Sequence, residues 1–447
     1  MENPIVSIVK NKVTPDENRI IEMAKEAVDL IGGMESIVKK GDVVAIKANF
    51  FAPYPPPVTV DRRTVRAIIR MLYQAGASKV ILAEGCSVGT KLGRNTITAE
   101  IVEELGIAEV AAEEGAELLL LEDAERVLVK VPDAKSISEI YYPKALLDCD
   151  VLVDLPCMKM HGMTLVTLGI KNFQGLLNDE QKYYAHRDDL EQKLVDIFKI
   201  RKPDLTFIDG ITAMEGNGAG EHGDPHPMNM FIASKDVVAA DAVATACMGI
   251  DDVLDVIATR IAQYDGIGCA DLNKIKVVGA QIDEVKEKFK YPEKQAMPLE
   301  RMLLGNFENV DVRVGGACRQ CWYLAISMAR TLSKYKDEKF TLVLGADPKV
   351  ANQELIDTEG VVIFGDCACA ATGNIKDLRN RMLIEGKGVI AAGCPPYRPA
   401  TAAVEKYLIA RGLLDEKSLE IGNEKSKKRT YDYYRTVDPT WIPKSEK

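Results

Sequence analysis

Short apolar runs alternate with segments of helical spacing through the first 280 residues of the chain. Runs rich in Val, Ile and Leu are typical of strands buried on both faces, and apolar residues three and four apart are typical of helices that cover a core. The predicted strands cover residues 5–9, 43–47, 79–84, 151–155, 205–208 and 231–234, and the main predicted helices cover 17–31, 64–75, 190–199 and 237–249. This alternation predicts an α/β fold with a largely parallel sheet flanked by helices.

The same pattern predicts the domain organisation. A second, smaller α/β pattern appears late in the chain, with predicted strands at 341–344, 360–364 and 388–392 that each lead into a glycine-containing turn. A segment rich in charge and interrupted by Pro292 and Pro298 separates the two patterns. The predicted parts are a large domain (1–282), a linker (283–305), a cysteine-rich domain (306–425) and a basic, aromatic tail (426–447) that is expected to pack on a domain or a partner.

The charge balance limits the classes of partner. The chain of 447 residues carries 57 Lys and Arg against 67 Asp and Glu, a formal net charge of −10. Because nucleic-acid surfaces depend on clustered Lys and Arg, we expect no nucleic-acid partner. The first residues lack a positive region followed by an apolar core, and no apolar run has spanning length. The sequence therefore predicts a cytoplasmic protein with no membrane partner. If the protein binds an anion, we expect a local cationic pocket to bind it.

The stretch from residue 154 to residue 175 is the first candidate site. It follows the buried strand predicted at 151–155 and contains Lys159, His161, Lys171 and Asn172 in a segment that is otherwise apolar and punctuated by glycine. Ligands of open α/β sheets lie beyond the carboxyl ends of the strands. A lysine partly buried among other cations has a lowered pKa, so Lys159, His161 and Lys171 are the candidate catalytic residues.

Further polar residues at other predicted strand ends would complete an anion pocket. Positive side chains and amides from several strand ends suit a carboxylate or a phosphate, and glycines offer backbone N–H groups. The run Gly216, Gly218, Gly220 lacks the order of a dinucleotide fingerprint and the Lys of a P-loop. The candidate substrate-binding residues are Lys47, Asn49, Asn172, His186, Arg187, Asp209, Glu215 and Gly218.

Five of the ten cysteines fall in the last third of the chain. Cys318 and Cys321 have chelating spacing, and Cys367 and Cys394 each follow a predicted strand of the smaller domain. Because disulfides are disfavoured in a reducing cytosol, the cluster predicts a metal site. Four thiolates suit one iron–sulfur cluster, with zinc as the alternative. Cys369 makes five candidates for four positions, so the choice between Cys367 and Cys369 stays open.

Two resemblances add to these observations. The motifs at 47–50, 154–161, 167–175 and 209–216, with Asp236 and Asp241, resemble domain-of-unknown-function family 362 over residues 1–280. Members of that family are commonly described as iron–sulfur-binding, often through a ferredoxin-like insert that this chain does not carry. Residues 365–373 and 393–396 are similar to segments of nickel–iron hydrogenase small subunits, which implies a 4Fe–4S cluster. The arrangement of Lys159, His161 and Lys171 is also similar to lactate racemase-type enzymes.

Three functions are compatible with these features. The leading hypothesis is an iron–sulfur oxidoreductase that acts on a small anionic substrate and exchanges electrons with a redox partner protein. The second is a non-redox lyase or isomerase with a structural metal, and the third is an electron-transfer or cofactor-assembly protein. A homo-oligomer is also compatible with these features.

Overall fold

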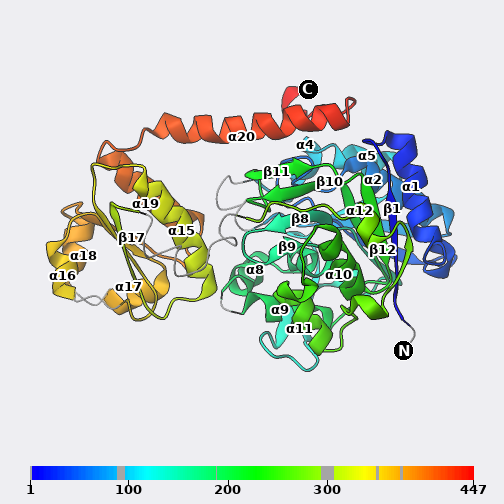
Figure 1. Ribbon diagram of the computed structural model, residues 1–447, viewed down its shortest axis with the longest axis horizontal. Helices are drawn as coiled ribbons and strands as arrows, with labels where there is room; N and C mark the ends of the chain where they lie inside the picture. The colour runs from blue at the N-terminus through cyan, green and yellow to red at the C-terminus, as the bar shows by residue number, and fades with distance from the viewer. Residues whose placement is uncertain (1–2, 88–95, 188, 293–306, 349–351, 373–375) are drawn as a thin grey trace.

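The computed structural model describes residues 3–87, 96–187, 189–292, 307–348, 352–372 and 376–447. The described chain forms a large unit (residues 3–292), a small unit (residues 307–415) and a C-terminal segment (residues 416–447) that runs from the small unit to the large one (Figure 1). No helix in these ranges is both long enough and apolar enough to cross a membrane.

The large unit is built on a mostly parallel sheet. Its strands lie in the order β13 (Lys276–Gly279), β1 (Ile5–Lys10), β12 (Met230–Ser234), β10 (Leu205–Gly216), β7 (Val151–Asp154), β2 (Val43–Lys47), β3 (Lys79–Glu84), β4 (Glu117–Leu120). Strand β12 runs antiparallel to both neighbours, and the other neighbouring pairs in this order are parallel. A separate hairpin joins β5 (Arg126–Lys130) and β6 (Glu139–Pro143). The predicted α/β fold with a largely parallel sheet is confirmed.

Helices cover both faces of the central sheet, which explains why its middle strands are apolar throughout. One face packs on α1 (Glu17–Asp29), α2 (Arg62–Gln74), α4 (Thr98–Glu104) and α5 (Ile107–Glu113). The other packs mainly on α9 (Leu190–Phe198), α10 (Val237–Cys247) and α11 (Ile257–Tyr264). Short helices α6 (Lys144–Leu147), α7 (Gly169–Asn172), α8 (Asp179–Ala185) and α12 (Ile282–Val285) complete the unit. Side chains of Asp16, Asp61 and Asp236 cap α1, α2 and α10.

The strand predicted at 205–208 extends further than predicted, through the first glycine of the run Gly216, Gly218, Gly220. Strand β10 continues to Gly216, with an irregularity in pairing between Asp209 and Met214, and pairs with β8 (Cys157–His161) and β11 (Gly223–His226). A Cβ at Gly210 would lie 3.0 Å from the carbonyl oxygen of Met230 on the next strand. This glycine therefore permits close backbone packing within the sheet.

Strand β8 turns back into β9 (Leu165–Thr167), and this hairpin was not predicted from the sequence. Lys159 pairs with Thr167, and His161 pairs with Leu165. Helix α7, which carries Lys171 and Asn172, follows at once. The hairpin folds the stretch 154–175 back on itself, so that its polar residues lie beside the carboxyl ends of β2, β3 and β7.

The small unit has four parallel strands in the order β14 (Val310–Val314), β15 (Phe340–Leu344), β16 (Val361–Phe364), β17 (Gly388–Ala391). Helices α15 (Arg319–Ser333) and α19 (Arg398–Ala410) cover one face, and α16 (Asn352–Asp357), α17 (Asp366–Thr372) and α18 (Lys376–Leu383) cover the other. The predicted second α/β unit is confirmed. Its first strand, β14, was not predicted.

The boundaries differ from the predicted ones at both ends of the small unit. The part of the predicted linker from residue 283 to residue 292 packs on the large unit, because Phe289 is buried and Lys290 pairs with Glu215 at 2.7 Å. The rest of the predicted linker, 293–305, lies outside the described residues. Helix α20 (Glu416–Val437) begins inside the predicted cysteine-rich domain and continues into the predicted tail.

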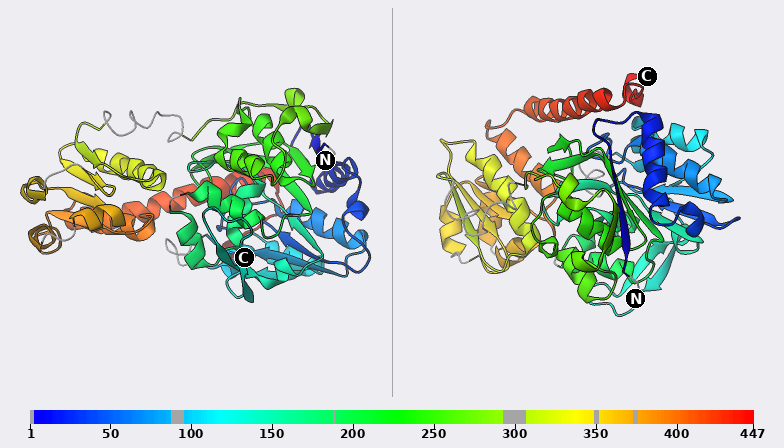
Figure 2. Two further views of the ribbon diagram at one scale, coloured as in Figure 1. Left: turned by 90° about the horizontal axis from the view of Figure 1, so that it is seen from below. Right: turned by 45° about the vertical axis from the view of Figure 1, so that its right-hand side comes forward.

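The C-terminal segment docks on the large unit through aromatic side chains. The Trp441 ring packs edge-on against Tyr431 and Tyr434, with ring centroids 5.0 and 5.2 Å apart, respectively. This cluster packs on Tyr54 and Val58 of the proline-rich loop at residues 53–58. Figure 2 shows that α20 spans the distance between the two units. The predicted packing of the aromatic tail on a domain is therefore observed.

Candidate functional site

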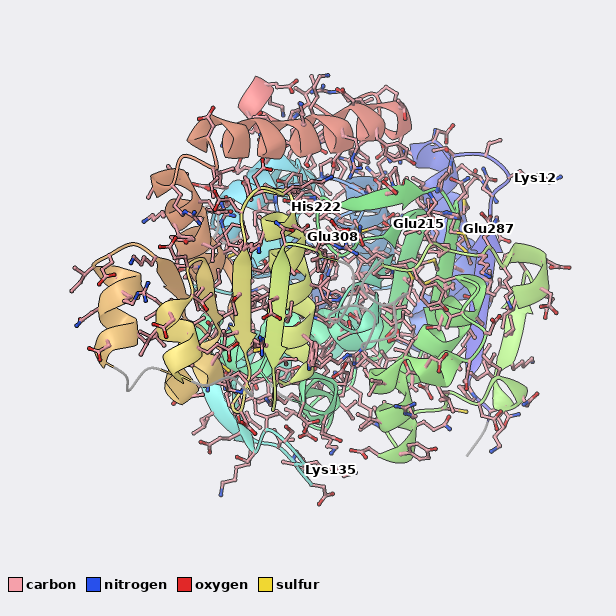
Figure 3. All side chains as sticks on the ribbon, turned by 60° about the vertical axis from the view of Figure 1, so that its left-hand side comes forward. Lys12, Lys135, Glu215, His222, Glu287 and Glu308 are labelled. Atoms are coloured by element: carbon pink, nitrogen blue, oxygen red, sulfur yellow. The ribbon has the colours of Figure 1, made fainter. Side chains whose placement is uncertain are left out.

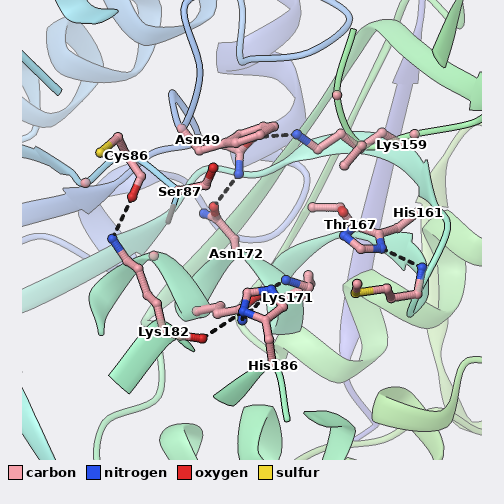
Figure 4. Close-up of a pocket in the computed structure, with 18 of the residues that line it drawn as sticks. Asn49, Cys86, Ser87, Lys159, His161, Thr167, Lys171, Asn172, Lys182 and His186 are labelled. Atoms are coloured by element: carbon pink, nitrogen blue, oxygen red, sulfur yellow. Dashed lines mark hydrogen bonds between the residues drawn. The ribbon is translucent and has the colours of Figure 1, made fainter. Parts of the chain in front are cut away.

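A cavity of about 290 Å³ lies between the two units. The large unit contributes residues from the carboxyl ends of β2, β3 and β8 and from α7 and α8, and the small unit contributes three side chains. Figure 4 shows lysine and histidine side chains converging on the hollow. Its described lining is Lys47, Asn49, Phe51, Glu84, Gly85, Cys86, Ser87, Lys159, His161, Met163, Thr167, Lys171, Asn172, Gln174, Gly175, Lys182, His186, Gly218, Ala219, Gly220, Tyr323, Leu324 and Tyr397.

Lys47 is a buried structural cation. Its Nζ lies 3.0 Å from Glu84, 2.6 Å from the carbonyl oxygen of Ala48 and 3.3 Å from Oδ1 of Asn172. These partners use all three N–H groups of the ammonium. Lys47 and Glu84 are both almost fully buried, so the pair neutralises its own charge and leaves no donor for a ligand.

Lys159 belongs to the same hydrogen-bond network and has one N–H group left for a ligand. Its Nζ donates to Oδ1 of Asn49 and to the carbonyl oxygen of Val58, both at 2.7 Å, and lies 4.4 Å from the centre of the Phe51 ring. Burial lowers the pKa of Lys159 to about 8. The side chain therefore exchanges its proton more readily than an exposed lysine does, and its third N–H is available to a ligand.

Asn172 connects the network to α7. Its Nδ2 donates to Asp154 at 2.8 Å, and its Oδ1 accepts from Asn49 Nδ2 at 2.8 Å. Asp241 accepts the backbone N–H groups of Gly169 at 2.8 Å and Ile170 at 3.0 Å, which fixes the first turn of α7. Both carboxyl groups are buried, and burial raises the pKa of each. The polar stretch is thus positioned by groups on β7 and α10.

Lys171 is oriented by a chain of hydrogen bonds. Its Nζ donates to Oε1 of Gln174, whose Nε2 contacts the His186 ring, and Nδ1 of His186 contacts the carbonyl oxygen of Lys182 at 2.7 Å. A carbonyl oxygen only accepts, so His186 is protonated on Nδ1, and its Nε2 accepts from Gln174. Burial lowers the pKa of His186 to about 3, which keeps the ring neutral.

The pKa of Lys171 is lowered to about 7, first by burial and then by the charge of Lys159. One N–H of its ammonium donates to Gln174, so two remain for a ligand. Near neutral pH this side chain is present in both protonation states. Such a group can both donate and accept a proton, which is the requirement for a general acid or base.

His161 has a fixed tautomer. Its Nδ1 accepts the backbone N–H groups of Met163 at 2.9 Å and Thr164 at 3.3 Å, so the proton of the neutral ring lies on Nε2. Burial, with the nearby charge of Lys171, lowers the pKa of His161 well below its usual value. His161 is therefore a neutral hydrogen-bond donor at the cavity. Of the acid and base roles predicted for it, this leaves donation of a hydrogen bond to a ligand.

Three predicted substrate contacts lie outside the described cavity lining. Oδ2 of Asp209 accepts the backbone N–H of Asp61 at 2.9 Å and so braces the loop before α2. Glu215 pairs with Lys290 and His226, and His226 also contacts Glu287. Glu215 and Glu287 are labelled in Figure 3. Arg187 is turned toward the small unit. Gly218, in contrast, does line the cavity.

Several lining residues were not selected from the sequence. Lys182 on α8 donates to the carbonyl oxygen of Cys86 at 2.9 Å and adds a fourth lysine to the cavity. Glu84 ends a predicted strand, and that position alone was a usable signal for it. Tyr323 and Tyr397 come from the small unit, and no local pattern predicts which face of one domain meets another.

The late cysteines gather at the carboxyl edge of the small sheet. Cys318 caps α15, Cys321 lies in its first turn, Cys367 follows β16, and Cys394 follows β17. The pKa of the Cys321 thiol is raised by a hydrogen bond with Cys318, by burial and by the nearby Cys367 and Cys394. Cys369 instead packs against the apolar cluster beneath α16 and α18. Within the described ranges, no group of three or more His, Cys, Asp or Glu side chains is arranged to hold a metal ion.

The edge of the small sheet that carries Cys318, Cys321, Cys367 and Cys394, here called the cysteine edge, lies next to the cavity. Nε of Arg187 donates to the carbonyl oxygen of Cys394 at 3.1 Å, and the Tyr183 hydroxyl donates to that of Pro395 at 2.9 Å. The Tyr397 ring packs edge-on against His186 with centroids 5.4 Å apart. The loop that carries Cys394 therefore ends in a residue of the cavity wall.

Fold and site define an α/β protein with a lysine-lined cavity at the carboxyl ends of a mostly parallel sheet. The model of the family described as "Domain of unknown function (DUF362)" matches residues 44–246, which contain all of the described large-unit lining. The chain is also 28% identical over 259 residues to a thylakoid-associated protein of Synechocystis sp. (strain ATCC 27184 / PCC 6803 / Kazusa), a match that covers 55% of this chain and 75% of that protein.

Two solved structures show limited likeness. The lactate racemase apoprotein from Thermoanaerobacterium thermosaccharolyticum aligns with a TM-score of 0.36 and 13% identity, over 53% of this chain and 55% of that one. A protein from Thermotoga maritima aligns with a TM-score of 0.30 and 14% identity, over 57% of this chain and 60% of that one. The alignments thus span less than two thirds of either solved chain.

Proposed function

We propose that this protein is an iron–sulfur oxidoreductase of the DUF362 family that binds a small anionic substrate in the cavity between its two units. The main support for this proposal is the contact between the cysteine edge and the cavity. Cys321 lies two residues before Tyr323, and Cys394 lies three residues before Tyr397, and both tyrosines line the cavity. A redox group on these thiols would adjoin the substrate.

The available hydrogen-bond donors support an anionic substrate. After their internal bonds are counted, Lys159 retains one N–H, and Lys171 and Lys182 each retain two. His161 adds its Nε2–H. The single carboxylate among the described lining residues, Glu84, is already paired with Lys47. An anion therefore meets uncompensated positive charge with little competing negative charge.

Lys171 is the proposed proton donor and acceptor. Its pKa of about 7 lies near neutral pH, where a general acid or base works best. His161, as a fixed neutral donor, would hydrogen-bond the substrate oxygen on which negative charge develops. Gln174 and His186 would hold the Lys171 amine in place without exchanging protons themselves.

The donor set of the small unit suits an iron–sulfur cluster. Cys318, Cys321, Cys367 and Cys394 would supply the four soft thiolate ligands that such clusters require, and Cys369 packs elsewhere. Their side chains would turn toward a common centre on binding, because among the described residues no three of them are already arranged to hold a metal ion. A bound cluster would supply single-electron transfer at this edge. The opposite side of the edge, where Cys367 is exposed, would face the redox partner.

A non-redox lyase or isomerase is the second candidate. The same Lys171 and His161 geometry favours it, because proton abstraction beside a carboxylate requires one base and one donor for the developing charge. The two candidates differ in one measurable respect. Turnover that is unchanged between the fully reduced and the fully oxidised protein supports the non-redox reaction.

Metal analysis of anaerobically purified protein tests the main proposal. We expect iron and acid-labile sulfide in equal amounts, lost in the Cys394→Ser and Cys367→Ser variants but kept in Cys369→Ser. Cys369→Ser is the matched control because it lies on the same helix as Cys367. Wild-type protein without iron and sulfide, or with zinc in their place, contradicts the proposal.

A further inference from the structure

The cavity lining contains two chemically different sets of side chains. The cationic wall consists of Lys159, Lys171 and Lys182 with the neutral donor His161, all from the large unit. The apolar wall consists of Phe51, Met163, Tyr323, Leu324 and Tyr397 and comes from both units. A fully polar anion such as phosphate needs donors on most sides, whereas a large part of this lining is aromatic or aliphatic.

The apolar wall is fixed in place. The Tyr397 ring packs edge-on against Tyr183 with centroids 6.0 Å apart, as it does against His186, and its hydroxyl lies 4.0 Å from the sulfur of Met163. Phe51 is held beneath Lys159 Nζ. A Cβ on Gly162 would lie 2.3 Å from the Tyr323 hydroxyl, so that ring lies directly against the backbone of the β8–β9 turn. Little movement is required before a ligand ring packs on these side chains.

The part of the ligand beyond its carboxylate, here called its body, would fit the apolar wall poorly if it were polar. A second carboxylate facing the apolar wall would meet ring and aliphatic carbons and at most a tyrosine hydroxyl, so it would lose its water without gaining a partner of equal strength, which is costly. An aromatic or other flat apolar body would gain from the same burial. The cavity volume of about 290 Å³ lies near the lower end of the range for ligand pockets, which fits one or two rings.

We infer that the substrate is a monocarboxylate carried on a flat apolar body of one or two rings, with its carboxylate on the cationic wall and its body on the apolar wall. This inference rests on the proposed anion-binding function and specifies the substrate class of that site. It also assigns a specificity role to the small unit, because Tyr323, Leu324 and Tyr397 would contact the body of the substrate.

Calorimetry on the full chain tests this with five probe anions, namely acetate, benzoate, 2-naphthoate, malonate and inorganic phosphate. We expect affinity to rise from acetate to 2-naphthoate by about tenfold or more, because the added rings bury apolar surface. We also expect 2-naphthoate to bind more tightly than malonate or phosphate. Affinity for 2-naphthoate no greater than for acetate overturns the inference, and the proposed function then survives if any other anion binds. Binding of none of the five overturns both.

Two variants separate recognition of the body from recognition of the charge. Tyr323→Ser removes part of the apolar wall, and Gly162→Ala displaces the same ring from behind, so each should reduce the preference for 2-naphthoate over acetate with little effect on acetate itself. Tyr264→Ser, at a tyrosine that is 75% exposed, is the matched control and should change neither affinity. Equal weakening of acetate and 2-naphthoate in both wall variants contradicts the inference.

Discussion

The guanidinium of Arg187 on the large unit donates a hydrogen bond to the backbone carbonyl of Cys394 on the small unit, with 3.1 Å between Nε and oxygen. The same loop continues through Pro395, which accepts from Tyr183, to Tyr397 in the cavity wall. The cavity and the cysteine edge are thus joined by one short loop. A change in the position of the small unit would alter both.

Replacement of Arg187 by Gln should loosen this connection. Hydrogen bonds from charged groups contribute roughly 1.5–3 kcal/mol, and Arg187 also places a positive charge near the Cys394 thiol. We expect weaker anion binding and a lower reduction potential of the proposed iron–sulfur cluster, since a cation stabilises the reduced state. Redox titration of Arg187→Gln beside wild type checks this. A potential that is unchanged together with unchanged affinity counts against a coupled site.

Lys171 should make stability depend on pH. Its pKa is about 7 in the folded protein and near its usual value of 10.5 when unfolded, so between these values the unfolded chain binds more protons. Stability should therefore rise with pH from about 7 to 10, by at most ~1.4 kcal/mol per pH unit for one proton. In Lys171→Met the rise should be smaller by this contribution. Chemical denaturation at several pH values measures it, and equal slopes for both proteins refute the lowered pKa.

The role assigned to His161 predicts a difference between two substitutions. Gln keeps a side-chain donor of similar reach, whereas Phe removes it, so His161→Phe should lose more kcat/KM than His161→Gln, by about 10²-fold if the donor stabilises transition-state charge. Because the ring stays neutral, the pH profile should not contain a His161 titration near 6.5. Loss of an acidic limb of the profile in His161→Gln would show that this histidine is the base instead.

The aromatic cluster of the C-terminal segment should support Lys159. Trp441 is 1% exposed, and the cluster packs on the loop whose Val58 carbonyl accepts from Lys159. Trp441→Ala should cost about 3–5 kcal/mol of unfolding free energy and also weaken anion binding. Ile442→Ala, next in sequence but 53% exposed, should change either quantity little. Urea denaturation and calorimetry compare the two, and a similar effect of both substitutions contradicts the packing argument.

The sequence predicted the large-unit site better than the contribution of the small unit. Lys47, Lys159 and Lys171 follow apolar runs, and the ends of parallel strands meet at one sheet edge, so local pattern was sufficient to group them. It did not distinguish Lys47, whose N–H groups are all used internally, from Lys171. The difference between the two lysines depends on their partners. Glu84, the partner of Lys47, is distant from it in sequence. Gln174, the partner of Lys171, is close in sequence but has no distinctive pattern around it.

Tertiary contacts account for the remaining differences. Asp209 and Glu215 follow a predicted strand, but β10 continues past them because Gly210 allows close packing on Met230. Tyr323 and Tyr397 join the cavity because the small unit docks on the large one, at the Cys394 loop and through the Arg319–Glu191 ion pair. Such docking depends on surfaces that form after each unit has folded, and short-range periodicity does not encode it.

We propose that an anion in the cavity and a redox centre on the cysteines form one site. Electron paramagnetic resonance of reduced, anaerobically purified protein tests it most directly, with and without a saturating 2-naphthoate or malonate probe. We expect an iron–sulfur signal whose g-values change on addition of the anion in wild type, with no change in Lys171→Met. Absence of an iron–sulfur signal, or a signal that is identical with and without bound anion, would contradict it.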